Sequence, residues 1–90
     1  MILISYDIKN DKLRNKFSKF IKKYGYRLQY SVYEITHSKN MLDNIRFSIV
    51  SNFEKKFTEN DSVIIIQTTD TNKIERFGYA KHDNDDIILV

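Results

Sequence analysis

The first seven residues alternate with the period of two that is typical of a β-strand. The even-numbered side chains Ile2, Ile4 and Tyr6 share one face, whereas the other face carries Ser5 and ends in the carboxylate of Asp7. A segment rich in lysine follows directly. The acid at the end of this strand is therefore the first candidate for chemistry in the chain.

Residues 11 to 24 change to a helical repeat, in which apolar side chains recur every three or four positions. This apolar stripe consists of Leu13, Phe17, Phe20, Ile21 and Tyr24. Asn10 or Asp11 can cap the start of the helix, and Gly25 is expected to end it in the left-handed conformation. The basic side chains lie off the stripe and face water or a partner.

The alternation of residues 26 to 35 changes phase partway along the segment. Apolar side chains occupy the even positions up to Val32, but Tyr33 and Ile35 then take the odd positions. A continuous strand cannot do this, because a shift of one residue exchanges its two faces. A bulge or a break near Val32 is expected, which makes two short strands or one bent strand.

A second helix and a doubly apolar strand follow. Residues 40 to 57 are predicted to be helical, with Ser38 or Asn40 as the cap. The buried stripe of this helix consists of Met41, Leu42, Ile45, Ile49, Phe53 and Phe57. Residues 62 to 68 are apolar on both faces, which predicts that both faces are covered.

Two helices can cover only one face of a small sheet, so the other face needs a different cover. The simplest is a second copy of the chain, packed sheet to sheet about a two-fold axis. A hairpin is expected at Lys73 to Tyr79. A last strand at Asp86 to Val90 could stay in its own sheet or extend the sheet of a partner.

Length and composition bound the class of protein. The 90 residues form a single domain, 1–90, because two domains would each be too small to bury a core. The chain has no cysteine, so thiolate metal sites are excluded, and His37 and His82 are too scattered for a zinc site. The sequence has neither a membrane-spanning run nor a signal-peptide pattern, which predicts a soluble, cytoplasmic protein without a membrane partner.

The net charge of +3 is modest but unevenly distributed, with basic residues near the N-terminus and acidic ones near the C-terminus. Contact with nucleic-acid phosphates is one interpretation of the basic residues, and an ordinary solvated helix surface is the other. The candidates for phosphate contact are Arg14, Arg27, Lys12, Lys16 and Lys19. The arginines are favoured because a guanidinium group binds phosphate through two hydrogen bonds.

Two interpretations of Asp7 are open. It can simply cap the following loop or helix. Alternatively, it meets its symmetry mate at the dimer junction, where two carboxylates could hold a hydrated Mg²⁺ that orients a phosphodiester and activates water. Tyr6, Tyr30 and Tyr33 could similarly stack on unpaired bases, although aromatic side chains at alternating strand positions mostly belong to the core.

Several spaced elements of the sequence resemble the Cas-two family, the small CRISPR-associated proteins of spacer acquisition. In order, they are YDI, DKLRNKFSKFIKKYG and YRLQYSVYE, with a looser continuation through the second helix, DSVIIIQ and KIERFG. The matching positions of the strong part are Tyr6-Asp7, Asp11, Arg14, Tyr24-Gly25, Arg27, Gln29 and Ser31-Val32.

This resemblance implies an α+β, ferredoxin-like βαββαβ sandwich with an extra C-terminal strand, paired sheet to sheet as a homodimer. The change of phase near Val32 supplies the strand that this fold needs. Asp7 would then be the catalytic and metal-binding acid, paired across the dimer interface, with Mg²⁺ or Mn²⁺ as the ion. Tyr6 and Ser31 would line the cleft beside it.

The function implied by the resemblance is CRISPR adaptation in antiviral defence. The dimer would bridge dimers of the Cas-one integrase and bind the double-stranded DNA of the prespacer. Family members are also described as metal-dependent endonucleases on RNA or double-stranded DNA. The main alternative is a VapD-like toxin ribonuclease, which shares the fold and would use the same acid on mRNA. A ferredoxin-like module that binds a protein or a small ligand is the third possibility.

Overall fold

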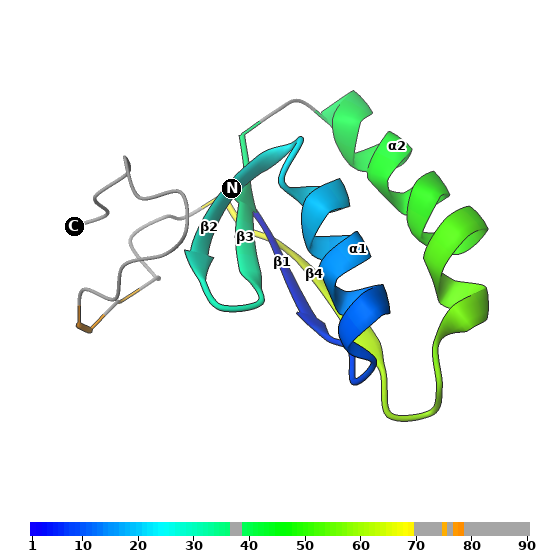
Figure 1. Ribbon diagram of the computed structural model, residues 1–90. Coiled ribbons are helices and arrows are strands. Elements are labelled where there is room, and N and C mark those ends of the chain that lie inside the picture. Colours follow the sequence, from blue (N-terminus) through cyan, green and yellow to red (C-terminus); the bar gives the residue numbers. More distant parts are fainter. Residues whose placement is uncertain (37–38, 70–74, 76, 79–90) are drawn as a thin grey trace.

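The chain folds into two layers, a four-stranded sheet and a pair of helices (Figure 1). The computed structural model describes residues 1–36, 39–69, 75, 77 and 78. The elements are β1 (Ile2–Asp7), α1 (Asp11–Ile21), β2 (Gly25–Gln29), β3 (Val32–Ile35), α2 (Lys39–Ser48) and β4 (Ser62–Gln67). A π-helical turn, η1 (Ile49–Phe53), and a 3₁₀ turn, η2 (Glu54–Lys56), lie between α2 and β4. The order is βαββαβ, as the ferredoxin-like fold requires.

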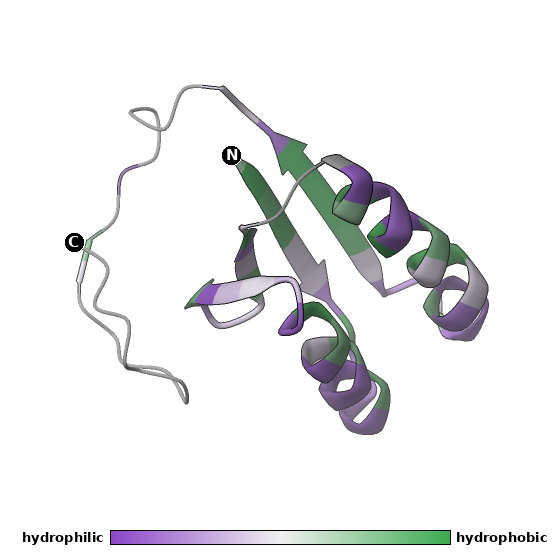
Figure 2. Cartoon of the chain, turned by 90° about the horizontal axis from the view of Figure 1, so that it is seen from above, coloured by the Kyte–Doolittle hydropathy of each residue, from purple (hydrophilic) through white to green (hydrophobic). Residues whose placement is uncertain are grey.

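The strands lie in the order β2-β3-β1-β4, and every neighbouring pair is antiparallel. Both helices lie on one side of this sheet (Figure 1). Seen from above, β1 and β4 are largely hydrophobic, whereas much of the helix surface is hydrophilic (Figure 2). We call the side of the sheet without helices the open face. Among the described residues, no helix is long and apolar enough to cross a membrane.

The core lies between the sheet and the helices. Ile4 and Tyr6 of β1 are buried there against Phe17 and Ile21 of α1. The ring of Phe17 also meets the ring of Phe53 in η1, with centroids 5.0 Å apart, and so joins the two helical segments. Burial of each such side chain stabilises the fold by about 1.5–3 kcal/mol.

Helix α1 begins as predicted but ends for a different reason. The side chain of Asn10 accepts a hydrogen bond from the backbone N–H of Leu13 at 2.9 Å, which confirms it as the cap. The helix stops at Ile21, and Gly25 is the first residue of β2 without a left-handed backbone. The prediction that Gly25 ends the helix is therefore wrong. Glycine is required there because a Cβ would lie 1.8 Å from the carbonyl oxygen of Glu34.

The change of phase in residues 26 to 35 corresponds to a tight hairpin between β2 and β3. Strand β2 ends at Gln29 and β3 begins at Val32, so Tyr30 and Ser31 form the turn. Ser31 adopts a left-handed backbone with φ of 70°, and the pairing shifts between Arg27 and Gln29. The prediction of two short strands with an irregular pairing is confirmed.

The second helical segment is not a single α-helix, because α2 stops at Ser48. From Ile45 onward the apolar residues of the stripe are four positions apart. On a regular α-helix each such residue would point about 40° further around the helix axis than the one before it. The π-helical turn η1 widens the backbone through i→i+5 bonding. Ile49 and Phe53 thereby stay buried in the core.

Helix α2 begins at Lys39, so Asn40 lies inside the helix and is not its cap. The other predictions about loops and the C-terminal region lie wholly or mostly outside the described residues. They are the cap Ser38, the loops of His37 and His82, the hairpin at 73–79 and the strand at 86–90.

Strand β4 is apolar on both faces, as predicted. Val63 and Ile65 pack against the core, whereas Ile64 and Ile66 lie on the open face and are 54% and 45% exposed. The described residues therefore cover only one face of this strand.

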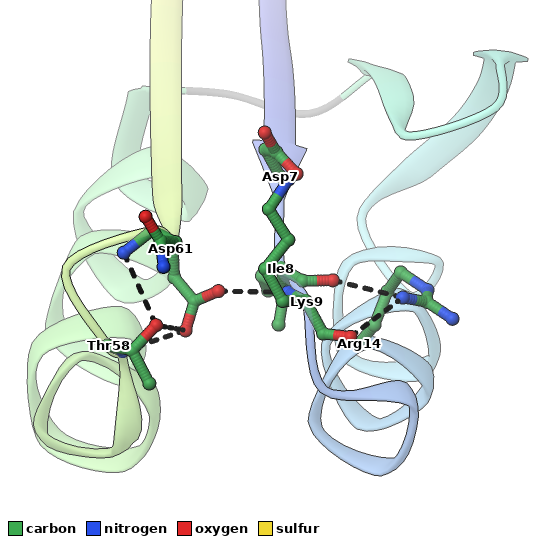
Figure 3. Close-up of polar contacts among 7 residues, drawn as sticks. Asp7, Ile8, Lys9, Arg14, Thr58 and Asp61 are labelled. Carbon is green, nitrogen blue, oxygen red and sulfur yellow. Dashed lines mark hydrogen bonds and ion pairs between the residues drawn. The ribbon is translucent and has the colours of Figure 1, made fainter.

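Asp61, just before β4, ties together the two loops at the end of the sheet (Figure 3). One carboxylate oxygen accepts a hydrogen bond from the backbone N–H of Lys9, and the other accepts one from that of Thr58, both at 2.8 Å. These donors hold the pKa of Asp61 below its ordinary value. The loop that follows β1 is therefore anchored from the side of β4.

The close contact of Gly25 predicts that Gly25→Ala lowers the free energy of unfolding by about 3 kcal/mol, because the added methyl group meets a backbone carbonyl that cannot rotate away. Chemical denaturation measures this loss. Gly78→Ala is the comparison, because no atom of the described residues lies within 4 Å of its added Cβ and the left-handed backbone, at φ of 83°, opposes the substitution. That variant should lose about 1 kcal/mol. If Gly25→Ala loses no more free energy of unfolding than Gly78→Ala, the close contact with Glu34 is not the reason for glycine at position 25.

The anchoring by Asp61 predicts a pH-dependent contribution to stability. Folding lowers the pKa of Asp61 from 3.8, so its contribution is complete above that pH and disappears as the pH falls through the lowered pKa. The free energies of unfolding of the wild type and Asp61→Asn should differ at neutral pH and converge in strong acid. A difference that persists unchanged in acid would exclude this role for the carboxylate.

Candidate functional site

Asp7 lies at the carboxyl end of β1, on the open face of the sheet as predicted. It is paired with Ser62 in the register of β1 and β4, two residues from Ile64. Its side chain is 63% exposed, and Oδ1 accepts a hydrogen bond from the ammonium group of Lys9 at 3.0 Å (Figure 3). The carboxylate is therefore accessible, with one weak surface ion pair.

The loop after β1 is held by α1 as well as by Asp61. The guanidinium group of Arg14 donates hydrogen bonds to the carbonyl oxygens of Ile8, at 3.0 Å, and Lys9, at 3.4 Å (Figure 3). It also pairs with the carboxylate of Asp11, which raises the pKa of Arg14. Because the side chain of Ile8 is buried in the core, this loop is fixed on three sides. Arg14 thus positions the backbone beside Asp7.

Four of the predicted site residues lie together in a small cavity of about 30 Å³. They are Tyr6, Arg14, Arg27 and Ser31, and the other lining residues are Asn15, Ser18 and Tyr30. Asp7 does not line this cavity, because neighbouring residues of a strand point to opposite faces. The prediction that Tyr6 and Ser31 line a cleft beside Asp7 is therefore corrected.

Arg27 connects the β2–β3 hairpin to α1. Its guanidinium group donates hydrogen bonds to the hydroxyl of Tyr33 at 3.1 Å and to that of Ser18 at 3.3 Å, and it lies 5.7 Å from the ring centroid of Tyr30. Tyr33 is fully buried, and burial raises the pKa of Tyr6. Of the three tyrosines considered for stacking on bases, only Tyr30 is largely exposed.

The predicted basic side chains Lys12, Lys16 and Lys19 are exposed on α1. They lie in the helical layer, whereas Asp7 faces the other side of the sheet. Lys55 and Lys56 of η2, which were not among the predicted site residues, line a groove together with Lys16 and Lys19. The sequence does contain a sign of them, because these two lysines are adjacent and lie near the end of the second predicted helix.

The described residues contain no group of three or more His, Cys, Asp or Glu side chains that could hold a metal ion. Among the described residues, Asp7 and Glu34 are carboxylates on the open face, and Asp7 is the more exposed of the two. Mg²⁺ keeps several of its waters and often binds proteins through one or two carboxylates, with substrate phosphates as further ligands. Asp7 could therefore supply one ligand to a hydrated Mg²⁺ or Mn²⁺ ion, whereas the described residues do not fit a structural zinc.

Comparison with known proteins identifies the family. Residues 1–76 match the family described as CRISPR associated protein Cas2. The chain is 39% identical over 46 residues to the CRISPR-associated endoribonuclease Cas2 3 of Synechocystis, which is 51% of this chain and 50% of that protein. It is 47% identical over 34 residues to the CRISPR-associated endoribonuclease Cas2 2 of Methanospirillum hungatei, which is 38% of each. The matched segments thus span half or less of these curated relatives.

Two crystal structures share the fold. Cas2 of Streptococcus pyogenes superposes with a TM-score of 0.69 at 21% identity, covering 86% of this chain and 98% of that one. A hypothetical protein of Thermus thermophilus superposes with a TM-score of 0.68 at 25% identity, covering 86% and 88%. These structures show the shared fold, and the sequence match over residues 1–76 shows that the chain belongs to the CRISPR associated protein Cas2 family.

Proposed function

We propose that this protein is a homodimeric CRISPR adaptation protein that binds duplex DNA and has a metal-dependent endonuclease centre at Asp7. The observation that carries the proposal is the accessible carboxylate of Asp7 at the margin of an uncovered apolar sheet face. The names of the curated relatives, which are endoribonucleases, support nuclease chemistry. Single-stranded RNA is therefore the second substrate class to test.

The open face supports the homodimer. Its apolar residues Ile64 and Ile66 of β4 are about half exposed, and the partly exposed Leu3 pairs with Ile66 in the register. Val32 is also partly exposed, with Ser5 of β1 between it and Ile64. Exposed apolar side chains gathered on one face are typical of an interface. A second copy is the proposed cover, and a two-fold axis near β1 brings the two Asp7 carboxylates to the junction between the protomers.

Asp7 of each protomer would hold the divalent ion, which supplies Lewis-acid activation of water and of the phosphodiester. Arg14 and Asp61 keep the loop behind Asp7 in place through their backbone hydrogen bonds. Lys9, which pairs with Asp7, lies close enough to contact a phosphate held at this carboxylate. Its ammonium group would add positive charge where the transition state gains negative charge.

In adaptation, the dimer would bridge dimers of the Cas-one integrase and support the prespacer duplex, a role that needs binding but no cleavage. Membership of the Cas2 family favours this function over that of a VapD-like toxin ribonuclease. The third possibility is a ferredoxin-like module that binds a protein or a small ligand and does not bind nucleic acid. Such a module would show no salt-dependent binding to DNA or RNA.

The nuclease proposal predicts that Asp7→Asn abolishes Mg²⁺-dependent cleavage of duplex DNA and single-stranded RNA, because a neutral amide cannot hold the ion. Cleavage of both substrates is measured with Mg²⁺ and with chelator. Asp43→Asn is the matched control, because Asp43 is 64% exposed and also pairs with a cation, Arg46, at 3.2 Å. Cleavage that survives in Asp7→Asn, or that is lost equally in Asp43→Asn, would contradict the role of Asp7.

The dimer proposal predicts that Ile64→Glu converts the protein to a monomer, because a buried unpaired charge opposes association. Sedimentation or light scattering measures the change in mass. Phe47→Glu is the matched control, because Phe47 is 73% exposed on α2, in the helical layer. A dimer that survives Ile64→Glu and dissociates with Phe47→Glu would place the interface on the helices instead.

A further inference from the structure

A lysine-lined groove runs between α1 and the segment that contains η1 and η2. It consists of two adjoining hollows of about 630 and 470 Å³, which share Lys16 and Lys56 as lining residues. The groove lies in the helical layer, and Asp7 does not line it, although Lys9 at one end of the groove pairs with Asp7. The seven lysines that line it are Lys9, Lys12, Lys16, Lys19, Lys23, Lys55 and Lys56.

The charge of this groove is almost entirely positive. Asp61 is its only lining carboxylate among the described residues, and its two oxygens already accept backbone hydrogen bonds. Of the seven lysines, only Lys9 forms an ion pair within the described part of the chain. Clustered like charges repel one another, so a groove of this composition attracts a polyanion.

The π-helical turn is what brings the two lysine rows together. Because of this turn, the ring of Phe53 remains in the core and packs against that of Phe20 in α1, with centroids 5.2 Å apart. The chain that follows Phe53 is thereby held beside α1, so that Lys55 and Lys56 line the same hollow as Lys19. Irregular π-helical turns occur frequently at functional sites.

We propose that this groove binds one phosphodiester strand of a nucleic acid duplex, at a site separate from Asp7. The 11 residues of α1 give the groove a length of about 16 Å, enough to contact successive phosphates of one strand. This inference rests on the proposed binding of duplex DNA and assigns a path to the strand. Lys55 and Lys56 are the new contact residues, and they approach the strand from the side opposite α1.

The test compares variants by the salt dependence of their affinity for a DNA duplex. The double variant Lys55→Gln/Lys56→Gln should reduce the slope of log affinity against log salt concentration by about 1.8, since each phosphate contact contributes about 0.9. The charge-matched control, Lys22→Gln/Arg46→Gln, removes two exposed cations that do not line the groove and should leave the slope unchanged. Lys55→Arg/Lys56→Arg keeps the charges and should retain the wild-type slope.

The outcomes separate the two proposals. If the wild type binds the duplex but the groove variant and its control have equal slopes, the groove proposal is overturned and the proposed function stands. If the wild type shows no salt-dependent binding, both are overturned. Thermal melting of each variant verifies its fold, which these exposed lysine side chains should not affect.

Discussion

Burial of one face of β1 against α1 is the interaction on which the rest of the structure depends. Ile4 and Tyr6 enter the core beside Phe17, and β1 lies at the centre of the sheet with β3 and β4 on either side. Because a strand alternates strictly, this packing directs Ser5 and Asp7 to the open face. The position of the one carboxylate considered for metal binding therefore follows from the core.

The sequence predicted α1, the break near Val32 and the placement of Asp7 because each has a periodic or local signal. The function of Gly25 could not be predicted, because it arises from a contact with Glu34 on another strand. The spacing of apolar residues predicted that Ile49 and Phe53 are buried in the core. It could not show that a π-helical turn is what keeps them there. Asp61 was missed as well, since its hydrogen bond with Lys9 joins residues that are 52 positions apart.

The predicted arginines illustrate how charge and role can differ. Arg14 and Arg27 were selected because guanidinium groups suit phosphates, yet both donate hydrogen bonds to the protein itself. Arg14 holds the loop behind Asp7, and Arg27 holds the hairpin against α1. The lysines of the groove, in contrast, lie on exposed helical surface, where a flexible ammonium group can follow a phosphate. Arg14 and Arg27 are therefore suited to a structural role, and the groove lysines are suited to electrostatic contact.

The two layers of the fold offer different surfaces, and their separation has a functional consequence. An apolar open face suits association with a second copy, which would place the Asp7 pair at a junction between protomers. A basic groove in the helical layer stays accessible in such a dimer, because the helices lie on the far side of each sheet. Dimerisation would thus present two grooves on the outer sides of one particle. A protein built in this way can hold a nucleic acid whether or not its carboxylates cleave it.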